Sequence, residues 1–425
     1  MSITRRKAVT WRLAGAAALG AAATACTGGS AESGRPRGAS SGVLGCETAR
    51  VPLAVDDGVF AYIEPENLFR VGSGFLVTGT PSYTWKPGTD ADSLPLTADQ
   101  HLAARFSLDG RATLIEQPID APIGDVRAVS LGGERWAVLF DEEASRDPSE
   151  WTRSEALWYA EHDGTRWTTV ESVPYPPDTR VRAHSSTEVV RMGDDLAWVV
   201  PVDLEGGRYQ LLEYRRTADG WTTAVVSDDA VEVSALAYDP DAGLWLAQFS
   251  EDPGLPGWQQ SLRLYRHAET WELVRRIAVM PEDGKVRDPG ITIFPTGVTV
   301  SWRVESREDV GAYAMVDVTP GGGGALVALD SAAWQVEPLS PPDDRPAWVV
   351  RHLAEDPPGV ELRLLRARPD GSAELVAAAP PGHPAGLASL ALAPNEALVV
   401  GPQVGTDPAY RYLRSLIIRL SPSCT

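Results

Sequence analysis

Short apolar runs separated by polar turns recur roughly every fifty residues between Leu102 and Leu420. The clearest polar turns are Asp163-Gly164 and Asp219-Gly220, each of which stands between an apolar run and a tryptophan. Asp-Gly favours the positive φ angles of tight hairpin turns, so each copy predicts a β-hairpin. After residue 30, helical spacing of apolar residues is never sustained over three turns. A fixed period of this length, built from strands and tight turns, is typical of a β-propeller.

Each propeller blade has four antiparallel strands, named a to d from the central channel outward. Seven apolar runs predict the b strands: Phe75–Val77, Trp136–Leu139, Trp198–Val200, Leu244–Leu246, Val298–Val300, Trp348–Val350 and Ala397–Val400. Seven four-stranded blades are therefore expected. Six or eight remain open, because the d strand within residues 311–341 is either Ala325–Leu329 or Trp334–Leu339.

The last repeat has a c strand at Leu413–Leu420 and no d strand after it, whereas residues 46–53 precede the first a strand without a hairpin partner. We expect this N-terminal segment to pair with the last blade, because that pairing removes an open sheet edge. Cys46 and Cys424 then lie near the ends of neighbouring strands. Disulfides persist in exported proteins, so a Cys46–Cys424 bond is expected, with two unrelated thiols as the alternative.

Residues 1–25 have the composition of an export signal peptide. Basic Arg5-Arg6-Lys7 precedes the short apolar segment Leu13–Ala23. That segment is too short for a permanent membrane span, which needs about twenty residues. The sequence around Arg5-Arg6 resembles a twin-arginine export motif, and an ordinary Sec signal is the alternative.

Ala23-Thr24-Ala25-Cys26 resembles the lipobox of bacterial lipoproteins, which implies that Cys26 is acylated and becomes the new N-terminus. Residues 26–45 are rich in Gly and Ser and are expected to form a flexible tether. Residues 46–425 are then the propeller domain. The expected location is the outer face of the cell membrane, with membrane contact through the lipid anchor only.

The formal net charge of −20 argues against nucleic acid as a partner, because phosphate binding needs clustered Lys and Arg. The six His are dispersed without metal-ligand spacing, so no metal site is predicted. No phosphate-binding Gly loop occurs in the sequence, and no cofactor is predicted. The protein is expected to be a monomer.

Two turns, Asp163-Gly164-Thr165-Arg166-Trp167 and Thr217-Ala218-Asp219-Gly220-Trp221, resemble the Asp-box (BNR repeat) of sialidase propellers. That box reads Ser/Thr-x-Asp-x-Gly-x-x-Trp and lies in the turn between the third and fourth strands; both copies here lack the residue between Asp and Gly. The resemblance implies a propeller fold. Because the box is structural in that family, it does not imply the activity.

A sialidase also needs an arginine cluster for the substrate carboxylate, a Tyr–Glu pair and an acidic residue. Leu68–Gly72 resembles the Phe/Tyr-Arg-Ile-Pro element that places the first arginine, here Arg70, with Gly72 in place of Pro. Arg127, Arg182 and Arg287 fall near the starts of a strands, so a ring of arginines facing the channel is expected. No motif places the Tyr–Glu pair or the acid.

The connections between b and c strands share one face with the d–a connections, and ligands usually bind at that face. Aromatic residues beside acids are expected in three of these loops: Tyr83 with Trp85, Trp151, and Trp258. They suit stacking on sugar rings or contact with a protein or cation; alternatively each fills its own blade.

The expected function is therefore a non-catalytic ligand-binding or scaffold module at the cell envelope, with a glycan, a peptide or an envelope protein as partner. The alternative is a sialidase-like glycoside hydrolase or lyase acting on extracellular glycans. Convergence of the four arginines with an acid and a Tyr in one pocket would favour the enzyme.

Overall fold

The computed structural model describes most of the propeller domain. The described residues are 46–51, 54–56, 59–85, 101–107, 112–121, 123–143, 154–174, 179–181, 188–204, 208–227, 230–251, 260–267, 269–279, 285–305, 310–319, 323–341, 343, 345–355, 358–379, 388–404 and 412–422. They all belong to the compact unit Ser41–Thr425. Within these ranges no helix is long and apolar enough to cross a membrane.

The described strands form seven blades, each a sheet of four antiparallel strands, and two blades carry one additional short strand. Blade 1 consists of β2 (Ala54–Asp56), β3 (Val59–Val71), β4 (Gly74–Trp85), β5 (His101–Phe106) and β6 (Ala112–Glu116). Blade 2 consists of β7 (Ile123–Gly132), β8 (Arg135–Glu143), β9 (Ser154–His162) and β10 (Trp167–Val173). Blade 3 consists of β11 (Thr179–Val181), β12 (Glu188–Met192), β13 (Asp195–Leu204), β14 (Arg208–Thr217) and β15 (Gly220–Ser227). Blades 4 and 5 consist of β16 (Ala230–Asp239), β17 (Gly243–Glu251), β18 (Gln260–His267) and β19 (Trp271–Val279), followed by β20 (Lys285–Phe294), β21 (Gly297–Glu305), β22 (Val310–Val318) and β23 (Ala325–Asp330). Blades 6 and 7 consist of β24 (Ala333–Leu339), β25 (Ala347–Glu355), β26 (Pro358–Ala367) and β27 (Ala373–Ala379), followed by β28 (Ala388–Ala393), β29 (Glu396–Val404), β30 (Tyr412–Leu420) and β1 (Cys46–Val51).

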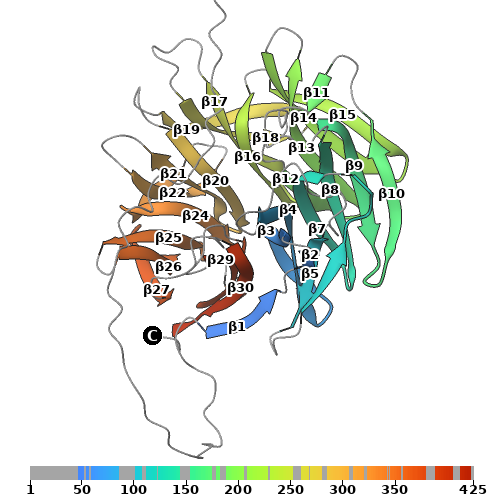
Figure 1. Ribbon diagram of the computed structural model, residues 1–425. Coiled ribbons are helices and arrows are strands. Elements are labelled where there is room, and N and C mark those ends of the chain that lie inside the picture. The colour runs from blue at the N-terminus through green and yellow to red at the C-terminus, as the bar shows by residue number, and fades with distance from the viewer. Residues whose placement is uncertain are drawn as a thin grey trace, which may run out of the picture. The chain divides into compact units, whose positions relative to one another are not determined.

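The innermost strands close a ring. Each a strand contacts the a strand of the next blade, from β3 through β7, β12, β16, β20 and β24 to β28, and β28 contacts β3 again. In Figure 1 the blades follow one another around this ring in the order of their colours. The prediction of a seven-bladed β-propeller is confirmed.

All seven apolar runs lie in b strands, as predicted. The ambiguous segment is also resolved, because Ala325–Asp330 is the d strand of blade 5, and Trp334 belongs to β24, the a strand of blade 6. β24 pairs with β25 in the same sheet. The d strand and the next a strand are thus separated by only two residues, a shorter connection than the sequence pattern suggested.

The propeller closes as expected from its incomplete last repeat. β1 pairs antiparallel with β30, with Cys46 opposite Arg419, and thereby occupies the d position of blade 7. Blue β1 lies beside red β30 in Figure 1. The disulfide remains a prediction, because Cys424 lies outside the described residues, as does the proposed lipidation site Cys26.

The Asp-Gly turn of blade 2 has the structural role that its resemblance to the Asp-box implies. Asp163 Oδ1 accepts hydrogen bonds from Thr165 Oγ1 (2.6 Å), Thr165 N (2.8 Å) and Arg166 N (2.9 Å), while Gly164 takes a φ of 100°. The hydrogen bonds from Thr165 and Arg166 lower the pKa of Asp163 to about 2. The turn therefore fixes the start of β10 through a carboxylate that stays ionised.

Tryptophans at the starts of d strands connect blades 2, 3 and 4 to the preceding blade. The indole Nε1 of Trp167 donates to Glu116 O (3.0 Å), that of Trp221 to Glu171 Oε1 (3.1 Å) and that of Trp271 to Glu213 Oε2 (2.9 Å). In each pair the acceptor lies one blade earlier in the chain. The repeated Trp therefore links neighbouring blades in addition to packing within its own.

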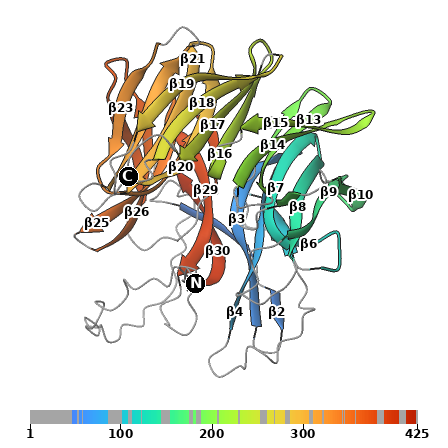
Figure 2. The same cartoon turned by 90° about the horizontal axis from the view of Figure 1, so that it is seen from above.

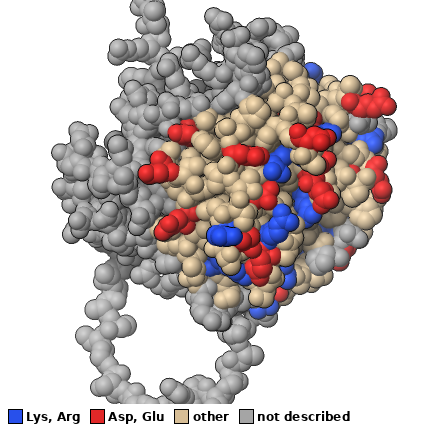
Figure 3. All heavy atoms as spheres, turned by 90° about the vertical axis from the view of Figure 1, so that its right-hand side faces the viewer, with Lys and Arg blue, Asp and Glu red and all other residues tan. Residues whose placement is uncertain are grey.

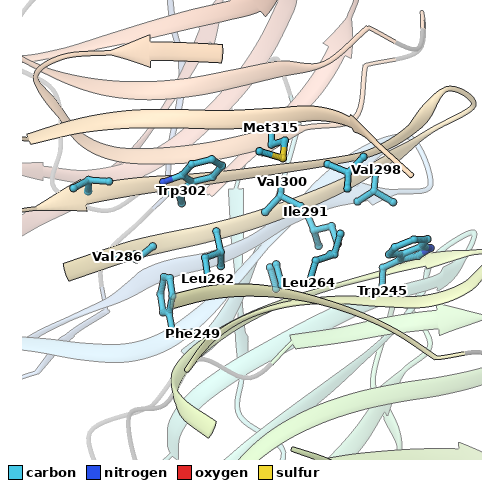
Figure 4. Close-up of a cluster of buried hydrophobic side chains, with 14 residues drawn as sticks. Trp245, Phe249, Leu262, Leu264, Val286, Ile291, Val298, Val300, Trp302 and Met315 are labelled. Carbon is cyan, nitrogen blue, oxygen red and sulfur yellow. The ribbon is translucent and has the colours of Figure 1, made fainter. Parts of the chain in front are cut away.

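The core consists of apolar clusters between neighbouring blades. The cluster between blades 4 and 5 includes Trp245 and Phe249 of β17 and Val300 and Trp302 of β21, all buried. In Figure 4 these side chains meet in the space between the two sheets. The alternation of β21 directs Val298, Val300, Trp302 and Val304 to blade 4, and the residues between them to the opposite side of the sheet, towards blade 6.

Candidate functional site

The two faces of the propeller are defined by which connections they carry. The a–b and c–d turns, including the Asp-Gly turns, share one face, here called the turn face. The b–c and d–a connections share the other, here called the b–c face. A strand end that precedes a b–c connection or follows a d–a connection therefore lies at the b–c face.

Arg70, which was expected to join a ring of arginines facing the channel, lies near the end of β3, the innermost strand of blade 1. Arg70 pairs with Phe75 directly beside the a–b turn, so it lies at the turn face. Its exposed guanidinium stands 5.6 Å from the centroid of the Phe75 ring. The register of the β3–β4 hairpin thus keeps Arg70 from joining the arginines at the opposite face.

Arg127 lies on the innermost strand of blade 2, as predicted, but its guanidinium already has a carboxylate partner. Only 7% of the residue is exposed, and its Nη1 forms an ion pair with Glu66 of β3. Glu66 also accepts a hydrogen bond from Thr80 Oγ1 (3.2 Å). Arg127 therefore joins the inner strands of blades 1 and 2.

The aromatic residues expected in the first b–c loop lie in a strand instead, so this loop assignment is wrong. Tyr83 pairs with Ala61 and Trp85 pairs with Val59, because the ladder between β3 and β4 continues beyond the blade. In Figure 2 this hairpin and the adjoining β2 extend past the other strands of blade 1. Trp151, Trp258 and Arg182 lie outside the described residues.

The fourth predicted arginine, Arg287, belongs to a charged group between blades 5 and 6, at the b–c face. We call this group the blade 5–6 cluster; it comprises Arg287, Asp288, Arg303, Glu305, Gln335 and Arg351. Arg287 and Asp288 follow the d–a connection at the start of β20. Arg303 and Glu305 precede the b–c connection at the end of β21.

The backbone at Asp288 departs from regular strand geometry. Arg287 pairs with Arg303 and Gly290 pairs with Ser301, so Asp288 and Pro289 together form a β-bulge. Asp288 has a φ of 48°, a left-handed conformation that is uncommon for a residue other than glycine. Bulges and positive φ angles at such residues are concentrated near functional sites, where surrounding contacts hold them in place.

Carboxylates and guanidiniums alternate through the cluster. Arg303 Nε donates to Asp288 Oδ2 at 3.0 Å, and Arg303 Nη2 lies 3.6 Å from Glu305 Oε2. Arg287 Nε lies 3.9 Å from the same Glu305 oxygen. The side chain of Arg303 is 13% exposed and that of Asp288 is 32% exposed. Asp288 is therefore the more exposed side chain of this pair.

Arg351 completes the group from blade 6. It is 4% exposed, and its Nη1 donates to Gln335 Oε1 at 3.2 Å. Partial burial raises the pKa of the Asp288 carboxyl, and the nearby charges of Arg303, Arg287 and Arg351 oppose that rise. Three arginines and two carboxylates give the cluster a formal charge of +1, within a chain whose net charge is −20.

Two buried hydroxyls lie on the same side of β21 as Arg303. Thr299 is 1% exposed and Ser301 is 0% exposed, and neither side-chain oxygen has a hydrogen-bond partner among the described residues. Buried polar groups usually have partners, so these hydroxyls mark polar sites between the blades that the described residues do not satisfy.

Sequence reasoning found Arg287 but missed Asp288, Arg303 and Arg351. A signal was available, because Val298-Thr299-Val300-Ser301-Trp302-Arg303 alternates apolar and polar residues in a b strand. The b strands of blades 3, 6 and 7 are instead continuous apolar runs, as expected for strands buried on both faces.

Elsewhere on the surface the charges are mixed. Figure 3 shows acidic and basic side chains interspersed over the described surface on the side of blades 2 and 3. Exposed or half-buried ion pairs there include Arg135 with Glu161 (3.3 Å) and Arg216 with Glu171 (3.1 Å). Among the described residues no group of three or more His, Cys, Asp or Glu is arranged to hold a metal ion.

No protein-family model and no curated protein matches the chain. The polysaccharide lyase Uly1 has a similar structure over 84% of this chain and 90% of its own, with 13% identity and a TM-score of 0.50. A Trypanosoma rangeli sialidase aligns with 88% of this chain and 57% of its own, with 11% identity and a TM-score of 0.41. The SapL1 lectin aligns with 73% of this chain and 95% of its own, with 12% identity and a TM-score of 0.38. At these identities the likeness concerns the propeller fold alone.

Proposed function

We propose that this protein is a non-catalytic binding module of the cell envelope, anchored by a lipid on Cys26, which takes an anionic ligand at the b–c face. The observation that carries the proposal is the blade 5–6 cluster. Its arginines come from two neighbouring blades and lie beside the connections that usually receive ligands. Guanidinium groups suit carboxylate, sulfate and phosphate because their planar donors match these anions.

The electrostatic setting supports an anionic ligand. The cluster is locally positive in a strongly acidic chain, and Arg303 and Arg351 are largely desolvated. Charge-assisted hydrogen bonds are stronger where water is excluded. An acidic saccharide is the preferred class of ligand, because the aromatic residues predicted on the b–c loops, Trp151 and Trp258, would supply stacking surfaces for sugar rings.

The alternative, a sialidase-like enzyme, has less support from the described residues. Tyr159 does donate a hydrogen bond to Glu161 Oε1 (2.6 Å), which is the residue pair that such an enzyme needs. However, Tyr159 is 1% exposed, and burial followed by this hydrogen bond raises the pKa of its phenol, which disfavours a nucleophile. Tyr159 lies on β9, a c strand of blade 2, away from the arginines of blades 5 and 6.

A screen of acidic glycans and cell-wall fragments, followed by charge-removing variants, tests the proposal. Arg287→Gln and Arg303→Gln should each weaken binding about tenfold to a hundredfold, the usual cost of removing an arginine anchor. Arg135→Gln is the matched control, because Arg135 is exposed, pairs with Glu161 and lies at the turn face. Equal binding by all three variants would rule out this cluster as the ligand site.

A further inference from the structure

We infer that Asp288 is a resident counter-ion of the binding site, which an incoming anion displaces from Arg303, so that ligand binding is coupled to uptake of a proton by Asp288. This inference rests on the proposed function and adds a mechanism that regulates the same site. It concerns one carboxylate, the arginine that holds it and the bulge that positions it.

The geometry makes Asp288 the carboxylate that depends on Arg303. Arg303 donates to Asp288 at 3.0 Å and lies 3.6 Å from Glu305, so it contacts two carboxylates. Glu305 is shared with Arg287, whereas Arg303 is the hydrogen-bond donor to Asp288. About a third of the Asp288 side chain is exposed, so the residue borders solvent at the b–c face.

The bulge explains why the carboxylate of Asp288 can move away from Arg303. Its φ of 48° is a strained conformation for a non-glycine residue and costs of order 1 kcal/mol, so contacts such as the bond to Arg303 must hold it. Pro289, which follows, limits the ways in which the bulge can relax. A ligand anion that takes over Arg303 removes the contact that holds the carboxylate in this position.

Displacement changes the protonation of Asp288. Partial burial already raises the pKa of the carboxyl, and Arg303, Arg287 and Arg351 are the charges that counteract the rise. Once Arg303 binds the ligand, and the ligand adds negative charge nearby, the ionised form of Asp288 loses most of its electrostatic stabilisation. Its pKa then rises further, and the site takes up a proton as it binds the anion.

Other titratable groups around Asp288 must be separated from this effect. Glu305 is the second carboxylate of the cluster. His352 follows Arg351 on β25, but its Nδ1 is bonded to both oxygens of Asp330 (2.9 and 3.0 Å). Replacement of Asp288 alone leaves both of these groups in place, so the difference between the two proteins reports on Asp288.

Inorganic sulfate is a suitable probe, because it offers the anionic chemistry without requiring the natural ligand. Sulfate affinity is measured by calorimetric titration of the whole protein at pH 7.5, 6.0 and 4.5 at constant ionic strength. The variants are Asp288→Asn and, as the matched control, Asp317→Asn. Among the described residues, Asp317 is the other non-glycine residue with positive φ (55°); it is exposed and accepts a hydrogen bond from Thr296. Asn tolerates this backbone conformation, so both variants should fold.

Wild-type affinity should increase as the pH falls, by at most tenfold per pH unit for one proton. Asp288→Asn should bind sulfate about tenfold more tightly than wild type at pH 7.5, because the competing charge is gone, and should lose most of the pH dependence. Asp317→Asn should behave as wild type. Weaker binding by Asp288→Asn, or an unchanged pH dependence, overturns the inference while leaving the anion site intact. Absence of sulfate binding by both wild type and Asp288→Asn at all three pH values overturns the anion site itself.

Discussion

Removal of the indole N–H of Trp271 should destabilise the junction between blades 3 and 4. Trp271 begins the d strand of blade 4 and donates to Glu213 Oε2 at 2.9 Å, on the c strand of blade 3. Glu213 is 2% exposed and also accepts two hydrogen bonds from Arg215, at 2.7 and 3.1 Å. Trp271→Phe keeps an aromatic ring in place but removes the only donor that the indole offers.

The magnitude follows from the charge and burial of the acceptor. A hydrogen bond to a charged group contributes about 1.5–3 kcal/mol to stability. The two bonds from Arg215 remain, so the carboxylate of Glu213 is not left without partners, and the loss should fall near the lower end of that range. The smaller ring also gives up part of its apolar contact, worth about 0.5–1 kcal/mol. We therefore expect a total loss of about 2 kcal/mol.

Urea unfolding provides the measurement, read as a lower midpoint with an unchanged slope. Trp334→Phe is the matched control. Trp334 is 43% exposed and, among the described residues, donates no hydrogen bond, so this change should alter stability by less than about 0.5 kcal/mol. A double-mutant cycle of Trp271→Phe with Glu213→Gln should give a coupling energy of about 1–2 kcal/mol. Equal effects of the two tryptophan changes, or strict additivity in the cycle, would refute the interblade role of Trp271.

Further predictions concern anchoring, closure, polarity between the blades and acid stability. Cys26→Ser should release the protein from the membrane fraction into the medium; continued membrane association would contradict the lipobox. Cys46 and Cys424 should resist thiol labelling in the folded, oxidised protein, and reduction should lower the free energy of unfolding by roughly 4–5 kcal/mol by loop entropy, less any strain; free thiols would disprove the bond. Thr299→Val should leave stability unchanged or raise it by about 1 kcal/mol, because the hydroxyl is buried without a partner in the described structure; a clear loss in thermal unfolding would mean that the hydroxyl is satisfied. Asp163 has a pKa lowered to about 2, so its stabilising contribution is fully present above its unfolded value near 3.8 and is lost as the pH falls through about 2; acid titration of Asp163→Asn beside wild type should show a stability difference that disappears at the lowest pH.

The architecture was predictable because its signals are local and repeated. Each b strand is an apolar run, and turns such as Asp163-Gly164 favour the hairpin conformation by their own backbone preferences. Closure by β1 was also predictable, since an incomplete last blade leaves an edge that only an unpaired segment such as residues 46–53 can cover. The strands and turns were predicted from residues adjacent in the sequence, and the closure was predicted from a missing strand. Both kinds of signal can be seen in the sequence itself.

The candidate site was less predictable because it depends on register. Arg70 and Arg287 both lie in a strands, yet one borders the a–b turn and the other follows a d–a connection, so they lie at opposite faces. The bulge at Asp288 shifts the pairing of β20 against β21; Pro289 indicates a bulge there, but it does not specify which residues of β21 and β25 come to lie beside Asp288. Tyr83 shows the same limit, because the distance over which β3 and β4 stay paired depends on both strands together.

The two sides of β21 differ in polarity, which is why we propose a binding site next to blade 6 rather than next to blade 4. Val300 and Trp302 pack β21 against blade 4 in an apolar cluster, and a charged group that exchanges partners would be poorly solvated there. On the opposite side, Thr299, Ser301 and Arg303 replace apolar residues that would stabilise the core more. Thr299 and Ser301 are buried without hydrogen-bond partners among the described residues, and such groups lower stability, so their presence beside Arg303 favours a role in binding over a role in folding. The proposed exchange at Asp288 needs a polar interface of this kind. The carboxylate can leave Arg303 only where neighbouring groups are polar enough to stabilise Arg303 both when it is bound to Asp288 and when it is bound to the ligand.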